Sequence, residues 1–152
     1  MQERSGRVVV FSASVVLPIT APPIRDGAIA VAAGRIRHGG DRAWVLHELH
    51  TRGLAFDEVH WPGVLTPGLV NAHSHLQYTG MAEVGQGRYA GFEEWAHAFQ
   101  PVYERGLDWG ADAAAGARAM IAAGTTAVAD IVTDVEAASA LHDARLHGIT
   151  SQ

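Results

Sequence analysis

Two histidines one residue apart, His73 and His75, are the residues of this sequence whose type and spacing best suit chemistry. They end the apolar stretch PGLVNAHSHL, residues 67–76. Side chains at positions i and i+2 of a strand point to the same face of a sheet, so both imidazoles would project together. Imidazole is a common metal ligand, and two on one face suit one metal ion. On spacing alone, an exposed bend remains an open alternative.

Polar side chains around the pair are candidates for supporting roles. A metal-binding imidazole donates its other N–H to an acceptor that fixes the tautomer, and Asn71, Gln77 or Asp130 could accept it. Gln77 and Tyr78 follow the pair, where polar and aromatic groups could orient a planar substrate ring. The alternative is an exposed loop start for Gln77 and Tyr78, and a cap or loop position for Asp130.

The elements that must position these residues begin after residue 66. LVNAH is a short apolar run and predicts a strand. Residues 77–91 contain four glycines, which is typical of a long loop. FEEWAHAF then has aromatic residues at helical spacing, and Pro101 is expected to end or restart that helix.

A second helix, a strand and a third helix follow. Asp108 is a plausible N-cap of an alanine-rich helix that Gly124 ends, and TTAVADI reads as a buried strand. The third helix is expected between Asp134 and His147, and Ile149 would open another strand. Strands that alternate with helices predict a parallel sheet with right-handed crossovers, an α/β fold.

Residues 1–64 read as short strands joined by turns. VVVFSASVVL is rich in β-branched residues, and GAIAVAAGRIRHGG predicts two strands with a tight turn at Ala33 and Gly34. FDEVHWPGV alternates polar and apolar residues until Pro62 and Gly63 are expected to end it. We therefore predict a β-sandwich segment over residues 1–64 and an α/β segment over residues 65–152.

Composition narrows the possible functions. The chain has 152 residues, 48% of them hydrophobic, which is enough for a packed core. Its formal charge of −5, without clustered basic residues, argues against a nucleic-acid partner. Because the chain has no cysteine, a metal ion would be held by histidine nitrogen and carboxylate oxygen, a ligand set that suits Zn, Fe or Mn.

The N-terminus imitates an export signal only superficially. Arg4 and Arg7 precede an apolar run, but Ser12 and Ser14 interrupt that run and no A-x-A cleavage site follows. The chain also lacks an uninterrupted apolar run long enough for a transmembrane helix, so no membrane span is expected. We expect a cytoplasmic protein.

Three motifs in order resemble the amidohydrolase superfamily of metal-dependent hydrolases. These are DGAIAVAAGRI, LTPGLVNAHSHL and GTTAVADI, and they look most like the branch of deaminases and chlorohydrolases that act on amino-substituted heterocycles. The resemblance implies a (β/α)8 TIM barrel with a small β-sandwich built from both chain ends. It also implies that His73 and His75 bind a divalent ion, Zn above Fe or Mn, and that metal-bound hydroxide attacks a small heterocyclic substrate.

The chain departs from that family in its extent. A complete barrel needs about 250 residues, so the barrel is expected to be incomplete here, with the general acid/base and the other metal ligands beyond residue 152. We expect an N-terminal fragment that is inactive alone and requires its missing C-terminal part or a homo-oligomer. The alternatives are a non-catalytic half-barrel assembly module and a chlorohydrolase of a triazine-like ring.

Overall fold

The computed structural model describes residues 7–151 of the chain, so Arg4 of the signal-like segment lies outside the described residues. The chain divides into two compact units, residues 1–67 and residues 68–152. Each unit has buried clusters of its own.

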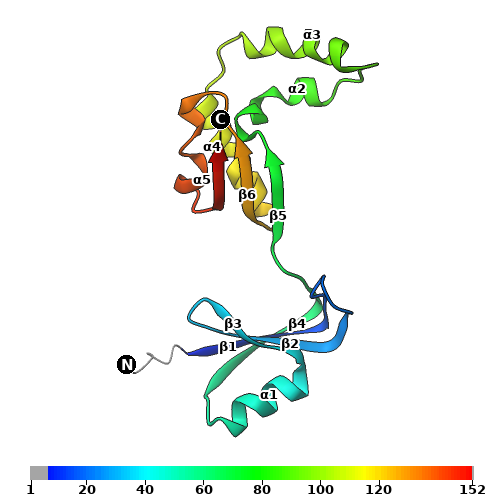
Figure 1. Cartoon of the computed structure of the whole chain (residues 1–152), viewed down its shortest axis with the longest axis vertical. Coiled ribbons are helices and arrows are strands. Elements are labelled where there is room, and N and C mark those ends of the chain that lie inside the picture. Colours follow the sequence, from blue (N-terminus) through cyan, green and yellow to red (C-terminus); the bar gives the residue numbers. More distant parts are fainter. Residues whose placement is uncertain (1–6, 152) are drawn as a thin grey trace. The chain divides into compact units, whose positions relative to one another are not determined.

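The first unit is a four-stranded sheet with one helix (Figure 1). The strands lie in the order β3-β2-β1-β4, where β1 pairs antiparallel with β2 and parallel with β4. Its elements are β1 (Val8–Val16), β2 (Ile24–Ala32), β3 (Arg35–Asp41), α1 (Arg42–Thr51) and β4 (Phe56–Leu65).

Helix α1 was not anticipated from the sequence, which suggested strands alone in this half. Asp41 caps it, because its carboxylate accepts a hydrogen bond from the backbone N–H of Trp44 at 3.1 Å. The helix buries Val45 and Leu49 in a cluster with the sheet residue Val10. So few buried positions in ten residues leave only a faint helical pattern in the sequence.

Two turn predictions in the first unit have different outcomes. The tight turn at Ala33 and Gly34 is confirmed, since both residues have the positive φ that a type I′ hairpin requires. The expected end of the last strand at Pro62 and Gly63 is wrong, because β4 continues to Leu65. A register shift in the pairing with β1 and the edge position of β4 accommodate the proline.

The second unit has a three-stranded parallel sheet in the order β5-β6-β7, as predicted from the alternation of strands and helices (Figure 1). Its elements are β5 (Leu69–Ser74), the 3-10 helix η1 (Leu76–Met81), α2 (Ala82–Gly85), α3 (Phe92–Tyr103), α4 (Trp109–Ala122), β6 (Thr125–Ile131), the 3-10 helix η2 (Val135–Ala137), α5 (Ala140–Asp143) and β7 (His147–Ser151).

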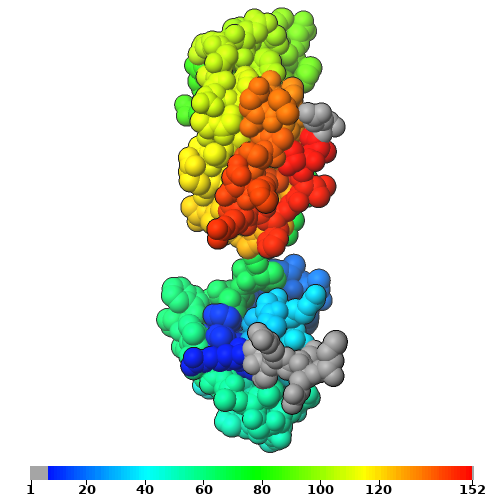
Figure 2. Space-filling view, turned by 90° about the vertical axis from the view of Figure 1, so that its left-hand side faces the viewer, coloured from blue at the N-terminus to red at the C-terminus, as the bar shows by residue number. Residues whose placement is uncertain are grey.

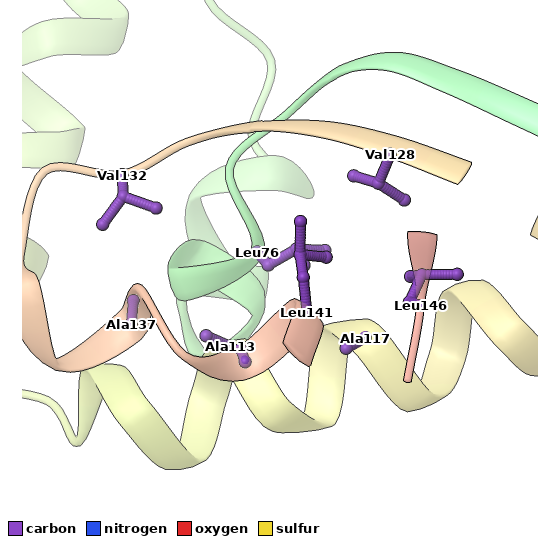
Figure 3. Packing of buried hydrophobic residues seen from close by; sticks show 9 residues of the cluster. Leu76, Ala113, Ala117, Val128, Val132, Ala137, Leu141 and Leu146 are labelled. Atoms are coloured by element: carbon purple, nitrogen blue, oxygen red, sulfur yellow. The ribbon is translucent and has the colours of Figure 1, made fainter. Parts of the chain in front are cut away.

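Helix α4 carries much of the core of this unit. The predicted cap at Asp108 is confirmed by a 2.9 Å hydrogen bond from the N–H of Ala111, and Gly124 follows the helix with a positive φ. Side chains from η1, α4, β6 and the α5 region meet in one apolar cluster (Figure 3). Figure 2 shows α4 and α5 as adjacent yellow and orange surfaces, with the red β7 beside α5.

Three details of the second unit correct the sequence prediction. The expected loop over residues 77–91 contains η1 and α2, which bury Met81 and Val84. Helix α3 runs through Pro101 to Tyr103 instead of ending at the proline. The single third helix is replaced by the short η2 and α5.

No helix between residues 7 and 151 combines the length and the apolar character needed to cross a bilayer.

Candidate functional site

The two histidines lie close together at the C-terminal end of β5. His73 is the penultimate residue of the strand and His75 is the first residue after it, and both are exposed. Their ring centroids are 5.2 Å apart with an interplanar angle of 70°. Ser74, between them, is buried and points the other way. The two imidazoles therefore face the same side, as two ligands of one ion require.

His75 has its tautomer set by the backbone of the neighbouring strand. Its Nδ1 lies 3.1 Å from the carbonyl oxygen of Ile131, the last residue of β6. A carbonyl oxygen can only accept, so Nδ1 carries the hydrogen and, in the neutral ring, Nε2 keeps a free lone pair. That arrangement is typical of histidines that bind metal ions.

Asn71 does not accept a hydrogen bond from either imidazole. Its side-chain oxygen accepts from the backbone N–H of His73 at 3.2 Å, and its nitrogen lies 3.7 Å from the sulfur of Met120 on α4. With strict alternation along the strand, Asn71 would share the face of His73. A register shift between Asn71 and Ser74, of the kind a β-bulge produces, turns Asn71 towards the helix layer.

Asp130 is also turned to the helix layer, and its hydrogen bonds go to the residues on either side of His75. It is 2% exposed and accepts hydrogen bonds from the Ser74 hydroxyl at 2.7 Å and the Leu76 N–H at 2.9 Å. On β6 it has the same parity as Val128, which is in the core beneath α4. Asp130 therefore anchors the chain on either side of His75.

Gln77 is fully buried, and its contact with substrate stays a prediction. Its Oε1 accepts from the N–H of Thr133 at 2.8 Å and, more weakly, from that of Asp134 at 3.4 Å. Its Nε2 donates to the Asp134 carboxylate at 2.7 Å. The 3-10 turn of η1 directs the side chain inward, where an extended loop would have left it in solvent.

Tyr78 joins His75 to a group of aromatic side chains. Its ring stacks on that of His75, with centroids 5.4 Å apart and an interplanar angle of 17°. The same ring has edge contacts with Phe99 at 5.2 Å, Trp109 at 6.2 Å and Tyr103 at 6.3 Å. Half-buried Tyr78 is therefore part of the wall beside the histidines, and its contact with substrate stays a prediction.

Asp134 links this wall to helix α3. The hydroxyl of Tyr103 donates to its carboxylate at 3.0 Å. That hydrogen bond, and after it burial, raises the pKa of Tyr103 above its ordinary value of 10.0. The phenol consequently stays a donor across the neutral range.

A surface pocket of about 360 Å³ borders the site on its helix side. It includes His75 and Tyr78 but not His73 among its lining residues. The remaining lining residues are Ser74, Leu76, Thr79, Gly116, Ala119, Met120 and Ala123. This hollow lies against α4 and is lined by only one of the two imidazoles, so it is not a place where both could bind one ion.

The histidine pair can hold two coordination positions of a metal ion but not a whole site. Within residues 7–151, no group of three His, Cys, Asp or Glu side chains is placed to hold an ion. A catalytic zinc site typically has three protein ligands and one open position. The geometry fits half of such a site.

Sequence reasoning missed the residues at the end of β6 and just after it, of which Ile131 contacts His75 while Thr133 and Asp134 contact Gln77 beside the pair. Ile131, Thr133 and Asp134 lie at the same sheet edge as the histidines, because the ends of adjacent parallel strands meet there. That position was readable from the alternation of strands and helices. The contact through the Ile131 carbonyl was not, because a main-chain acceptor leaves no trace in residue types.

Residues 64–149 match the family described as the amidohydrolase family. A search of curated proteins found no match to the chain.

Solved structures share the fold at low sequence identity. The A. niger ochratoxinase is 21% identical with a TM-score of 0.62, and the match covers 97% of this chain and 31% of that one. Helicobacter pylori aminofutalosine deaminase, solved with methylthio-coformycin, is 16% identical with a TM-score of 0.71, covering 93% and 34%. Guanine deaminase from C. acetobutylicum, solved with guanine in its active site, is 14% identical with a TM-score of 0.71, covering 95% and 36%.

The chain thus spans about a third of the length of these structures. The two deaminases are TIM-barrel amidohydrolases, so the prediction of a partial (β/α)8 barrel with part of a β-sandwich is confirmed. The family match covers more than half of the chain and includes the histidine pair. The chain belongs to the amidohydrolase family.

Proposed function

We propose that His73 and His75 are two ligands of a divalent metal ion in a metal-dependent hydrolase. The observation that carries this proposal is the imidazole pair at the strand end, with the Ile131 carbonyl leaving Nε2 of His75 free to bind. Zinc is the first choice, and Fe or Mn would accept the same nitrogen ligands. When bound, such an ion lowers the pKa of a coordinated water to about 7, which would make hydroxide available near neutral pH.

The chain's own residues would orient the two ligands and shield one of them. Ile131 holds the His75 ring through its backbone carbonyl, and Tyr78 covers one face of that ring. Asp130 fixes the backbone on both sides of His75. These contacts support a ligand held in place before the ion arrives.

The rest of the metal site, together with the general acid/base, is proposed to come from barrel strands outside this sequence. The outer edges of β5 and β7 have no strand partner among the described residues, so further strands could add there. Either the remainder of a longer protein or a second copy could supply them. In this proposal residues 1–64 form the sandwich segment and residues 65–152 the barrel segment, and the chain alone is inactive.

The proposed reaction is hydrolytic removal of an amino group from a small heterocycle, in the cytoplasm. HSHLQYTGM, GFEEWAHAF and DIVTD are similar to aminofutalosine deaminase, which makes aminofutalosine the first substrate to test. The fold shared with the two deaminases supports this class of reaction. A chlorohydrolase of a triazine-like ring is the second candidate, since a triazine hydrolase variant shares the fold at a TM-score of 0.64.

Metal binding by matched histidine variants tests the proposal. We expect the chain and His97→Ala, which changes an exposed histidine on α3, to bind Zn²⁺ equally in calorimetric titrations. His73→Ala and His75→Ala should each bind at least about tenfold more weakly, the lower end of what an outer contact alone costs. Equal affinity in all four proteins would remove the proposed site.

A further inference from the structure

Gln77 forms a buried clamp between the loop after β5 and the loop after β6. None of its surface is exposed, and its amide contacts Thr133 and Asp134 through both the oxygen and the nitrogen. A primary amide has two donor hydrogens and two acceptor lone pairs, so the one side chain can accept from Thr133 and donate to Asp134 at the same time. An apolar residue could fill the same space but would leave the Thr133 N–H and the Asp134 carboxylate without these partners.

The clamp lies next to the contact that sets the tautomer of His75. Thr133, held by Gln77, is two residues after Ile131, whose carbonyl accepts from His75. Gln77 in turn is two residues after His75. His75 and Gln77 on one side therefore contact Ile131 and Thr133 on the other, and the Gln77 amide holds the two loops in register.

The type of contact explains why a glutamine would be needed here. Apolar packing is non-directional and permits two loops to slide. A hydrogen bond weakens steeply when its distance or angle departs from the preferred geometry, so it fixes a register. The His75 to Ile131 contact, at 3.1 Å, depends on that register.

Tyr78 and Tyr103 extend the clamp on its outer side. The Tyr78 hydroxyl lies 3.0 Å from the Thr133 hydroxyl, and Tyr103 donates to the same Asp134 carboxylate that Gln77 contacts. The loop after β6 is therefore held from η1 and from α3 at once.

We propose that Gln77 is a positioning residue for the histidine pair. Gln77 holds the loop after β6, and this keeps the Ile131 carbonyl in place to accept the hydrogen of His75 Nδ1. The Nε2 atom of His75 is then left to bind the ion. The inference rests on the proposed metal site and deepens it. It assigns to Gln77 a role through His75 and not a contact with substrate.

The test compares Gln77→Met with Gln100→Met, the same substitution at an exposed glutamine of α3. Two-bond ¹H–¹⁵N spectra of the metal-free chain in alkaline buffer report which nitrogen of each neutral imidazole carries the hydrogen. We expect His75 to be mainly Nδ1-protonated in the unchanged chain and in Gln100→Met. In Gln77→Met that population should fall at least twofold, with the His73 spectrum unchanged.

Zinc titration supplies the second measurement. Loss of a contact that orients a ligand typically weakens metal binding about 10–100-fold. The Zn²⁺ affinity of Gln77→Met should therefore decrease by a factor in that range, while Gln100→Met should bind Zn²⁺ as tightly as the unchanged chain. An unchanged His75 tautomer in folded Gln77→Met would overturn the inference, whatever its unfolding free energy. If Gln77→Met does not fold, Gln77→Asn, whose amide is one methylene too short for both contacts, should change the tautomer in the same direction, and no change would overturn the inference.

The two measurements separate the inference from the proposed function. The tautomer is read without metal, so a Gln77-dependent tautomer in a chain that binds no Zn²⁺ would support the positioning role and contradict only the metal site. Zn²⁺ binding that depends on His73 and His75 but not on Gln77 would contradict only the positioning role.

Discussion

Asp130 supports the site through a buried carboxylate. It accepts from Ser74 and from the backbone N–H of Leu76, and all three groups are buried. Asp130→Ala would leave two buried donors without partners, so we expect the unfolding free energy to fall by about 1–3 kcal/mol. Urea unfolding measures this loss. Asp143→Ala, an exposed carboxylate bonded to Ser139, should lose no more than about 1 kcal/mol, and an equal loss in both variants would contradict the assignment.

Glu58 makes the stability of the first unit depend on acidity. Its two oxygens accept from Arg42 at 2.6 Å and 2.8 Å, and Ser12 donates to it at 2.6 Å. The hydrogen bonds from Arg42, only partly opposed by burial, lower the pKa of Glu58 below the ordinary 4.5. A carboxylate with a lowered pKa in the folded state stabilises it fully above the unfolded value, and this contribution is lost as the pH falls through the folded value.

We therefore expect the unfolding free energy to fall as the pH drops below about 4.5, and Glu58→Gln to make that decrease shallower. Urea unfolding of the first unit at several acid pH values, followed by hydrogen exchange, measures the slope. Glu48→Gln, which removes the more exposed pair with Arg52, serves as the control and should retain the full slope. The same acid slope in Glu58→Gln and in the unchanged chain would contradict the role of Glu58.

At the level of elements, the close approach of α4 to η1 depends on Gly116. A Cβ there would lie 3.1 Å from the carbonyl oxygen of Leu76 and 3.2 Å from its Cδ2, and still closer to the Thr79 hydroxyl. Gly116→Ala should therefore cost about 1–3 kcal/mol of unfolding free energy despite the better helix propensity of alanine. Gly85→Ala, with no atom within 4 Å of the new Cβ, should be neutral or stabilising, and urea unfolding distinguishes the two.

Elements with strong local signals were predictable, and those formed by packing were not. Helix α4 has a capping Asp108, an alanine-rich body and Gly124, so its bounds follow from residue types. Helix α1 buries only two residues, and the short α5 is held by Leu141 and Leu146 in the shared core. Such elements exist because a sheet face needs cover, which a local pattern does not encode.

At the scale of the whole molecule, the absence of a third metal ligand among residues 7–151 predicts that the chain by itself has no hydrolytic activity. Two imidazoles leave an ion without the three protein ligands of typical catalytic zinc sites. We expect the Zn²⁺-loaded chain to release no ammonia from aminofutalosine or guanine above the buffer rate in a coupled assay. Release that His73→Ala abolishes would show that the chain completes a site by itself, for example by association of copies.

The family and the parallel order of the barrel segment were readable from the residues alone, because apolar periodicity, caps and the H-x-H motif are local properties. The roles of the surrounding polar residues depended on tertiary structure. A register shift in β5 turned Asn71 to the helix layer, and the 3-10 turn of η1 buried Gln77. Which atom His75 faces depends on how two loops meet across a sheet edge. That meeting is set by long-range pairing between β5 and β6, which patterns of neighbouring residues along the chain do not reveal.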